Sequence, residues 1–351
     1  MSRIRDLCSP LGASVREVME AIDRNKAGIA LVVGEDGRLV GTITDGDVRR
    51  FILSGGGIDQ PAEGLVWRHP VTAPAGASRQ VLGELLEKHK IRNIPLLDPD
   101  GRPVGLFTHR ELLATQGTEP CAVVLAGGEG TRLRPLTDSV PKPMITVGGT
   151  PLLECLVEGL VRSGFKHLFL SVNYKAQVIE EHFGDGSRFG ASITYLREDS
   201  KLGTAGPLSL LPPQSCPVLV SNGDLLTTTD FFSLYEFHAQ HRCVMTVAGI
   251  EYKVKVPYGV LRTAEHYLLG VEEKPEQKFL CNGGIYVLNP ELIHMVPAGR
   301  AFDMTDLLAK VLQAGLPVAT FPVHEYWVDI GEMPDLERAQ REFKVAFGGK
   351  D

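Results

Sequence analysis

An internal repeat at an offset of 64 residues constrains the fold of this chain more than any other feature. At that offset Pro10-Leu11-Gly12-Ala13-Ser14 aligns with Pro74-Ala75-Gly76-Ala77-Ser78, and Asp36-Gly37-Arg38 aligns with Asp100-Gly101-Arg102. Each copy predicts a helix after Ser14 or Ser78, a strand, an Asp-Gly turn, a second strand and a short helix. Because a unit of about 60 residues buries too little surface alone, we expect two copies to pack together around a cleft.

The repeat resembles a known ligand-binding module. Two β-α-β-β-α copies with Gly41-Thr42-Ile43-Thr44-Asp45-Gly46-Asp47 are similar to a cystathionine-β-synthase (CBS) domain pair, an α+β fold. The resemblance implies that Thr44 and Asp47 grip the phosphate and ribose of an adenine or guanine nucleotide. The second copy has Thr108 but Glu111 at the equivalent positions, and the longer carboxylate is expected to shift its half-site.

Two alternatives for this pair stay open. Thr44 and Asp47 bracket a strand-to-helix junction, where both residue types are favoured as caps. The pair could also serve only for dimerisation. We place the repeats at about residues 1–57 and 64–117, with a flexible link over Leu53 to Glu63 and a hinge over Thr115 to Pro120.

Charge and composition exclude several classes of protein. The 351 residues carry a net charge of −7, which opposes broad attraction to nucleic acid or to an anionic membrane. No apolar signal core or membrane-length apolar stretch is present, so we expect a cytoplasmic protein. The six scattered cysteines show no close pair, which predicts free, buried thiols.

From Cys121 onward, strands and helices alternate along the chain. The predicted strands are Cys121 to Ala126, Leu168 to Val172, Ile193 to Leu196 and Val218 to Ser221, and the predicted helices are Pro151 to Ser163 and Ala176 to His182. This alternation predicts a parallel, doubly wound α/β sheet. Ligands of such folds lie beyond the carboxyl ends of the strands, where Gly127 and Asp224 emerge.

A glycine-rich loop follows the first of these strands. It reads Gly127-Gly128-Glu129-Gly130-Thr131-Arg132, and Lys142 lies between two prolines further on. Glycines let backbone N–H groups approach phosphates, while arginine and lysine supply charged donors. The Walker pattern is absent and the dinucleotide fingerprint fails at Leu133. We therefore predict a polyphosphate site of another type.

The complete string is much more specific than its glycines. Leu125 to Thr137, together with Pro141-Lys142-Pro143, resembles the signature of sugar-1-phosphate nucleotidyltransferases. Further segments agree in order: Asp199 to Gly206, Asn222-Gly223-Asp224, Tyr258-Gly259, Glu273-Lys274-Pro275, Asn282 to Tyr286 and Trp327 to Gly331. The resemblance implies a Rossmann-like, doubly wound mixed sheet over residues 118–351.

The resemblance also implies roles for individual residues. Arg132 and Lys142 would be catalytic, with Lys274 anchoring the sugar phosphate, and Asp224 and Asp329 would bind Mg²⁺. The remaining predicted substrate-binding residues are Leu125, Ala126, Gly127, Gly128, Gly130, Thr131, Gly203, Thr204, Ala205, Asn222, Gly223, Tyr258, Gly259, Glu273 and Asn282.

Each of these residues also has a structural interpretation. Asp224 or Asp329 alone at a strand end is usually a cap or turn residue, and a lysine between prolines is usually solvated. His238 and His241 lie one helical turn apart, but without a third ligand we interpret them as solvated or capping residues.

The sequence favours transfer of a nucleotidyl group from GTP to a sugar 1-phosphate by a homo-oligomer. The domain order resembles the glucosamine-1-phosphate guanylyltransferases of bacterial nonulosonic (legionaminic) acid pathways. Mannose or heptose 1-phosphate, and another nucleoside triphosphate, remain alternatives. A different class of protein, a non-catalytic sensor of nucleotides or nucleotide sugars, also remains.

Overall fold

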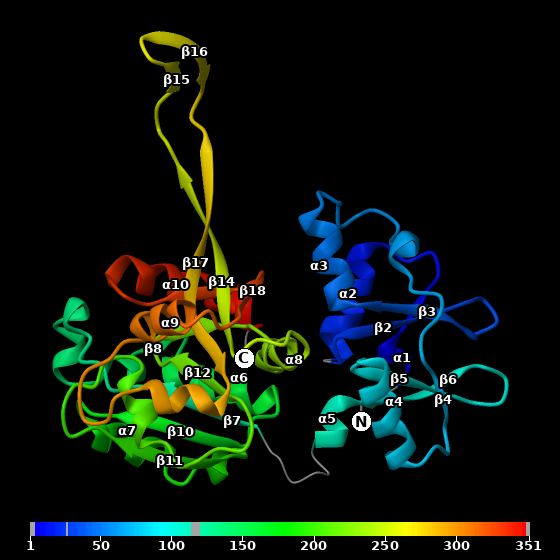
Figure 1. Ribbon diagram of the computed structural model, residues 1–351, viewed down its shortest axis with the longest axis horizontal. Helices are drawn as coiled ribbons and strands as arrows, with labels where there is room; N and C mark the ends of the chain where they lie inside the picture. The colour runs from blue at the N-terminus through cyan, green and yellow to red at the C-terminus, as the bar shows by residue number, and fades with distance from the viewer. Residues whose placement is uncertain (1–3, 26, 114–119, 349–351) are drawn as a thin grey trace. The chain divides into compact units, whose positions relative to one another are not determined.

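The computed structural model (Figure 1) describes residues 4–25, 27–113 and 120–348, and the chain forms two compact units, Met1–Thr118 and Glu119–Asp351. The hinge expected over Thr115 to Pro120 lies outside the described residues, except for Pro120. Each unit is described separately below.

The first unit contains the same motif twice. Its two three-stranded sheets are β1 (Cys8–Pro10), β2 (Ile29–Val33) and β3 (Leu39–Thr44), and β4 (Ala73–Pro74), β5 (Asn93–Leu97) and β6 (Pro103–Thr108). In each sheet the first pair is parallel and the second antiparallel. The helices are α1 (Ile4–Leu7), α2 (Val15–Asn25), α3 (Asp45–Leu53), η1 (Ala62–Leu65), α4 (Arg79–His89) and α5 (His109–Leu113). Each repeat has its own apolar core.

Residues 53–63 link the two repeats and are joined to the first repeat by backbone hydrogen bonds. The backbone N–H of Val15 donates to the carbonyl of Gln60 at 2.9 Å, and that of Ala62 donates to the carbonyl of Ala13 at 2.9 Å. Ser14 and Glu17 form a capping box at the start of α2, with the Ser14 N–H donating to the Glu17 carboxylate at 2.7 Å and the Glu17 N–H donating to the Ser14 hydroxyl at 3.3 Å.

The second unit is built on a seven-stranded sheet in the order β11-β10-β7-β12-β17-β14-β18. These strands are β7 (Cys121–Leu125), β10 (His167–Val172), β11 (Ser192–Arg197), β12 (Val218–Asn222), β14 (Met245–Lys255), β17 (Glu276–Leu288) and β18 (Val318–Val323). β17 runs antiparallel to both of its neighbours, while the other neighbouring pairs are parallel. The sheet is therefore mixed.

Both faces of this sheet are covered. Ala122 and Val124 of β7 belong to one apolar cluster, and Cys121 and Val123 belong to the other. The main helices are α6 (Leu152–Arg162), α7 (Ala176–Phe183), α8 (Phe231–Gln240), α9 (Met304–Gln313) and α10 (Met333–Phe347). α6 packs its apolar residues into the first cluster and α9 into the second. This alternation confirms the doubly wound α/β fold.

The remaining elements of this unit are short. Two small strand pairs flank the sheet, β8 (Thr146–Val147) with β9 (Thr150–Pro151) and β13 (Leu225–Thr227) with β19 (Trp327–Asp329). The 3-10 helices are η2 (Thr131–Leu133), η3 (Leu136–Asp138), η4 (Lys142–Met144), η5 (Ser187–Phe189), η6 (Gly206–Leu210) and η7 (Pro290–Met295).

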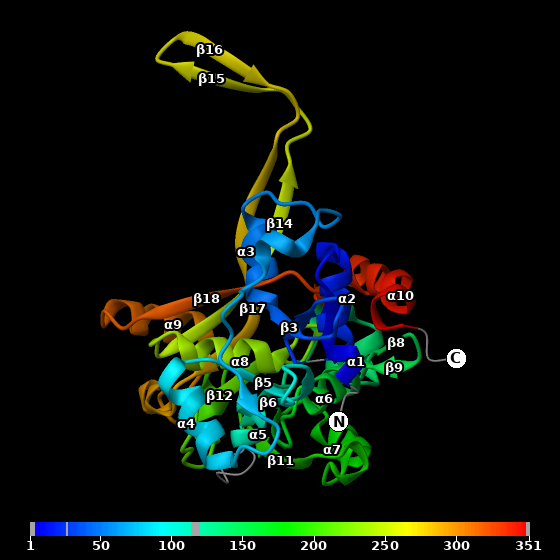
Figure 2. The same ribbon diagram turned by 90° about the vertical axis from the view of Figure 1, so that its right-hand side faces the viewer.

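One part of the second unit projects from its body. β14 and β17 continue beyond the sheet as a two-stranded ribbon, which ends in the hairpin of β15 (Val260–Ala264) and β16 (Tyr267–Glu272), as both views show (Figures 1 and 2). We call residues 251–280 the arm.

Two further expectations can be compared with the structure. Cys121, Cys155 and Cys243 form no disulfide and are buried, but Cys8 and Cys216 are only half-buried and Cys281 is exposed, so the prediction of burial is wrong for these three. Cys281 is exposed because it lies at the base of the arm, where no other element covers the ribbon. None of the helices in the described ranges is long and apolar enough to cross a membrane.

Candidate active site

The conformation of the glycine-rich loop after β7 requires glycine at two positions, Gly127 and Gly130. Gly130 has a φ of +62°, and a Cβ there would lie 2.7 Å from the Cβ of Lys142. A Cβ at Gly127 would lie 2.6 Å from a carboxylate oxygen of Glu198. Around Gly128, in contrast, the space is open. The loop therefore packs closely on one side and leaves backbone accessible on the other.

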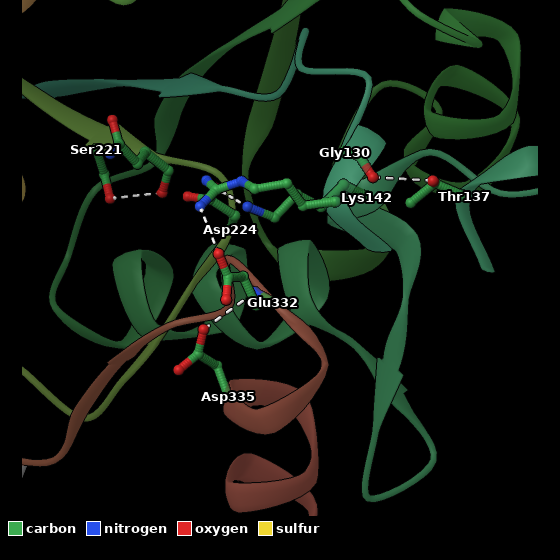
Figure 3. Close-up of polar contacts among 9 residues, drawn as sticks. Gly130, Thr137, Lys142, Ser221, Asp224, Glu332 and Asp335 are labelled. Carbon is green, nitrogen blue, oxygen red and sulfur yellow. Dashed lines mark hydrogen bonds and ion pairs between the residues drawn. The ribbon is translucent and has the colours of Figure 1, made fainter. Parts of the chain in front are cut away.

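Lys142 is held beneath this loop by a carboxylate. Its ammonium group forms an ion pair with Oδ2 of Asp224, which follows strand β12 (Figure 3). The Lys142 side chain is only 10% exposed and that of Asp224 25%. Burial of charge is costly unless the charges are paired, and this contact pairs the two side chains. The solvated interpretation of Lys142 is excluded.

The second carboxylate oxygen of Asp224, Oδ1, is available to a ligand. This oxygen is buried and accepts no hydrogen bond from any described residue. Asp329 lies across from it, because β13 and β19 pair antiparallel with Leu225 opposite Asp329. The backbone N–H of Ile330 also donates to the Asp224 carbonyl at 3.2 Å.

The two carboxylates influence each other. Desolvation raises the pKa of Asp329, the negative charge of Asp224 raises it further, and Lys142 opposes both effects. More than a third of Asp329 remains exposed. The effect of Asp224 on its pKa nevertheless shows that the two carboxylates lie close together. Two close carboxylates with an unsatisfied buried oxygen fit the preference of Mg²⁺ for hard oxygen ligands.

The rest of the coordination sphere would come from outside the protein. Among the described residues no group of three or more His, Cys, Asp or Glu could hold a metal ion. Mg²⁺ typically binds to one or two carboxylates together with water and substrate phosphate oxygens. The donor set therefore fits a metal that arrives with a phosphorylated substrate.

Arg132 reaches the same region from the glycine-rich loop. Its guanidinium lies 3.3 Å from Oε1 of Glu332, and it also acts on the charge of Asp329. Glu332 is the N-cap residue of α10 and forms a capping box with Asp335 (Figure 3). Because the side chain of Arg132 is 69% exposed, it is free to turn toward a bound anion.

A cavity of about 120 Å³ adjoins Asp329. It is lined by Asn222, Leu225, Asn282, Gly283, Gly284, Tyr286, Trp327 and Asp329. The Asn282 amide donates to the Tyr286 hydroxyl at 2.8 Å, and the Trp327 indole N–H donates to the Gly283 carbonyl at 2.9 Å. These bonds fix a polar wall beside the carboxylates.

The segment from Gly203 to Ala205 donates hydrogen bonds to Phe302 and Asp303, about 100 residues further along the chain, and we call this contact the clasp. The backbone N–H of Thr204 donates to Oδ1 of Asp303 at 2.9 Å, and that of Ala205 donates to the Phe302 carbonyl at 2.9 Å. Gly203 has a φ of +76°, and a Cβ there would lie 2.6 Å from the same Asp303 oxygen. This clasp fixes the loop's shape.

Glu198 connects this segment to the glycine-rich loop. Its carboxylate accepts hydrogen bonds from the Ser171 hydroxyl and, at 3.1 Å, from the Leu202 N–H. On the surface, Lys201 pairs with Glu129 at 2.9 Å, and this hydrogen bond lowers the pKa of Glu129. Sequence reasoning assigned no role to Glu198 or Asp303, although Glu198 directly precedes the Asp199 to Gly206 motif.

The predicted site residues of the second unit thus form three groups, one of which is the segment Gly203, Thr204 and Ala205 described above. Those brought together around the loop and the carboxylates are Leu125, Ala126, Gly127, Gly128, Gly130, Thr131, Arg132, Lys142, Asn222, Gly223, Asp224, Asn282 and Asp329. Gly223 contributes by close approach, since a Cβ there would lie 2.7 Å from the Leu125 carbonyl. Tyr258, Gly259, Glu273 and Lys274 lie instead on the exposed arm, where Lys274 is 3.9 Å from Glu273.

In the first unit, the predicted nucleotide residues form helix caps. The Thr44 hydroxyl donates to Asp47 at 2.6 Å, and the Asp47 N–H donates back to Thr44 at 3.3 Å. Thr108 and Glu111 repeat this arrangement, with the Thr108 N–H donating to Glu111 at 2.9 Å. The capping interpretation therefore describes both pairs, although the Thr108 hydroxyl lies 3.4 Å from the Glu111 carboxylate, against 2.6 Å between Thr44 and Asp47.

His238 differs from its expectation. It is buried, and its ring nitrogens lie 2.9 Å from the Thr246 hydroxyl and 2.9 Å from the Asn289 amide oxygen, so the solvated or capping interpretation is wrong for it. The residue turns inward because α8 packs this face against β14 and β17. His241 instead bonds the Phe237 carbonyl at 2.8 Å, which is a capping role.

Comparison with known families agrees with this geometry. Residues 121–345 match the family described as "Nucleotidyl transferase", and residues 5–54 and 62–116 match the CBS domain. The chain belongs to the nucleotidyl transferase family. The predicted combination of a sugar nucleotidyltransferase fold with a CBS pair is thereby confirmed.

Relatives within this family act on sugar phosphates by name. A UTP–glucose-1-phosphate uridylyltransferase of Synechocystis sp. is 34% identical over 241 residues, which cover 63% of this chain and 62% of that protein. A mannose-1-phosphate guanylyltransferase of Mycobacterium tuberculosis is 34% identical over 226 residues, which cover 62% of each chain. The match therefore spans less than two thirds of the length of these relatives.

A solved structure shares the fold of the second unit. The crystal structure of HddC from Yersinia pseudotuberculosis aligns with a TM-score of 0.51 and 26% identity, covering 64% of this chain and 100% of that one. A second structure of HddC, described as complexed with GMP-PN, aligns with a TM-score of 0.50 and 26% identity over the same shares of the two chains.

Proposed function

We propose that this protein transfers a guanylyl group from GTP to a sugar 1-phosphate and releases pyrophosphate. The observation that carries the proposal is the buried pair of Lys142 and Asp224 beside Asp329, directly beneath a glycine-rich loop. A lysine ammonium, two carboxylates and accessible backbone thus lie together between β7 and β12, where the strand order of the doubly wound sheet reverses. Ligands of such folds bind at this switch point.

The chemistry needs little beyond these groups. A sugar 1-phosphate is already an anion, so its oxygen can attack the α-phosphorus of the triphosphate without a general base. The new oxygen–phosphorus bond forms as the bond to the β-phosphate oxygen breaks, and pyrophosphate leaves with its electron pair. The protein supplies alignment and neutralises charge.

Individual residues take the following parts. Lys142 holds the phosphates from below the loop, and Arg132 turns from Glu332 to the departing pyrophosphate. Asp224 and Asp329 would hold Mg²⁺, which neutralises phosphate charge when bound. Asn222 and Asn282 face the sugar phosphate in the adjoining cavity.

The choice of GTP follows from the relatives. A guanylyltransferase is among the most similar curated proteins, and a solved structure of the same fold holds a guanine nucleotide analogue by its title. Glucosamine, mannose and heptose 1-phosphates are the candidate acceptors, and Lys274 on the arm stays the proposed anchor of the sugar phosphate.

Pyrophosphate release tests the proposal. Four nucleoside triphosphates are combined with glucosamine, mannose, heptose and glucose 1-phosphates in the presence of Mg²⁺. We expect GTP with one acceptor to exceed every other pair, and chelation of the metal to stop release. A chain that binds GTP but releases no pyrophosphate with any acceptor would instead be a sensor.

For the first unit we propose that the CBS pair binds an adenine or guanine nucleotide and alters activity or assembly. Two related half-sites are supported by the CBS matches at residues 5–54 and 62–116 and by the equivalent positions of Thr44 with Asp47 and Thr108 with Glu111 in the two repeats. Calorimetry of the full chain with AMP, ATP and GDP tests this, with Asp47→Asn against Asp36→Asn as the control. If no nucleotide binds, or if both variants bind equally, the assignment fails.

A further inference from the structure

An exposed tryptophan lies beside the nucleotide residues proposed for the first unit. Trp67 is 62% exposed, more than any other large apolar side chain in the described part of that unit. A single exposed apolar residue is ordinary on a protein surface, so the position of the ring must indicate what it contacts.

The backbone fixes Trp67 to the edge of the first sheet. The Thr42 N–H donates to the Trp67 carbonyl at 3.0 Å, and the Trp67 N–H donates to the Thr42 carbonyl at 2.9 Å, which makes an antiparallel bridge to β3. Gly41 permits this approach, because a Cβ there would lie 2.4 Å from the same Trp67 carbonyl oxygen. The position of the indole is therefore tied to that of β3.

The pairing places Trp67 on the same face of the sheet as Thr44. Residues directly opposite each other in an antiparallel pair point to one face, and side chains alternate along a strand. Trp67 therefore shares a face with Thr42, and Thr44 follows on that face after ~7 Å of strand. Thr44 is the N-cap of α3 and is hydrogen-bonded to Asp47.

The second repeat packs against this same face. In β2, Ile29 lies opposite Thr44 and Leu31 lies opposite Thr42. Ile29 and Leu31 are buried in an apolar cluster to which Leu106 of β6, in the second repeat, also contributes. The indole thus lies on the sheet face where the two repeats meet, which is where the sequence predicts a cleft between them.

The indole is held in one orientation with its polar group already satisfied. Its Nε1–H donates to the His69 carbonyl at 2.9 Å. The His69 ring stands edge-on to it, with 6.4 Å between the ring centroids and 88° between the planes. What the side chain still offers to a ligand is the face of its π-system, on a rigid aromatic group that loses little conformational freedom on binding.

Three kinds of group follow one another along this part of the sheet. The N-terminus of α3 favours an anion. The Thr44 hydroxyl and the Asp47 carboxylate lie at that terminus, where the 72% exposed side chain of Arg50 pairs with Asp47. The indole comes next. A nucleotide carries a matching series: an anionic phosphate, a ribose with hydroxyl groups and a flat aromatic base.

We propose that Trp67 stacks on the purine base of a nucleotide whose phosphate and ribose lie at Thr44 and Asp47. The inference rests on the nucleotide site proposed above for the CBS pair and adds the residue that binds the base. Every base has a π-face that an aromatic side chain can cover, and a purine offers a larger face than a pyrimidine.

Tryptophan fluorescence of the full chain tests this directly. The chain contains two tryptophans, Trp67 and Trp327, so Trp327→Phe leaves Trp67 as the single indole. We expect AMP or GMP to quench its emission with the same Kd that calorimetry gives. CMP should quench less, and ribose 5-phosphate, which has no base, should not quench at all.

Matched variants test the contribution of the ring to affinity. Trp67→Ala should raise the Kd for AMP roughly 10-fold, whereas Trp67→Phe keeps an aromatic face and should raise it less than about 3-fold. Val81→Ala is the control, because Val81 is also exposed, at 47%, but lies on α4. Circular dichroism checks that each variant is folded.

The possible failures separate the two proposals for this unit. If AMP binds and Asp47→Asn weakens it but Trp67→Ala does not, the stacking role is overturned while the nucleotide site stands. If no nucleotide binds, both are overturned. A Trp67 emission that acrylamide cannot quench in the free chain also overturns the stacking role, because the ring would then be covered by its own chain.

Discussion

Lys142 and Asp224 show how a few side chains define the site. The lysine forms its ion pair with Oδ2 of Asp224, while Oδ1 of Asp224 is buried and accepts no hydrogen bond from any described residue. An amide at position 224 would remove one negative charge from both functions while keeping the shape.

We expect Asp224→Asn to lower guanylyl transfer by roughly 100-fold or more at saturating Mg²⁺, because the metal and Lys142 both lose a charged partner. Steady-state release of pyrophosphate measures the effect. Asp138→Asn is the control, since Asp138 is exposed on η3 and pairs only weakly with Arg134 at 3.5 Å. An unaltered rate in Asp224→Asn would remove this residue from the site.

Gly130 provides a second test at a single position. Its positive φ and the 2.7 Å approach of a Cβ to Lys142 predict that Gly130→Ala lowers the free energy of unfolding by about 1–3 kcal/mol. Gly128→Ala meets open space and should change it by less than about 0.5 kcal/mol. Urea denaturation compares the two, and equal losses would contradict the described loop conformation.

His238 predicts a pH dependence of stability. Burial lowers the pKa of its imidazole, so the unfolded chain binds a proton more readily than the folded one below about pH 6.5. Stability is therefore fully present above that pH and declines as the pH falls toward the lowered value. The melting temperature of the wild type should drop more than that of His238→Gln between about pH 7.5 and 5.5. Parallel profiles would argue against this assignment.

Among the elements, we expect the clasp between the Gly203 to Ala205 segment and the start of α9 to link the stability of that helix to nucleotide binding. Asp303 caps that helix and also accepts from the Thr204 N–H and hydroxyl. One carboxylate thus fixes both a helix terminus and the loop that the family resemblance assigns to the base.

We expect Asp303→Ala to lower stability by about 1 kcal/mol, as the loss of a helix cap does, and to raise the KM for GTP roughly tenfold. Asp230→Ala is the matched control, because Asp230 caps α8 through the Phe232 N–H at 3.0 Å without touching that loop. If both variants show the same KM, the clasp has no part in nucleotide binding.

The sequence predicted the elements that local patterns define. Short apolar runs located β7, β10 and β12, and the glycine string located the loop beneath which Lys142 lies. The clasp by Asp303 could not be predicted, because it joins residues 99 positions apart that only the folded sheet brings together. Burial of His238 was missed for the same reason, since its partners Thr246 and Asn289 lie on later segments.

For the whole molecule, the sequence predicted two folds: a pair of α+β repeats from the internal repeat, and a doubly wound α/β sheet from the alternation of strands and helices that begins at Cys121. It did not predict the arm. Alternation along β14 and β17 is visible in the sequence, but whether such strands stay within a sheet or leave it depends on neighbours that end earlier, as β12 and β18 do. For that reason Tyr258, Gly259, Glu273 and Lys274 were expected among the substrate-binding residues, although none of them lines the cavity beside Asp329.

Phosphorus-31 NMR of the full chain with GTP, Mg²⁺ and the best sugar 1-phosphate tests whether the two phosphate-bearing substrates are joined. Our account predicts equal amounts of pyrophosphate and of a sugar nucleotide with two coupled diphosphate resonances, and neither product in Asp224→Asn. Release of orthophosphate and GDP instead, or turnover of GTP that is independent of the sugar phosphate, would contradict it.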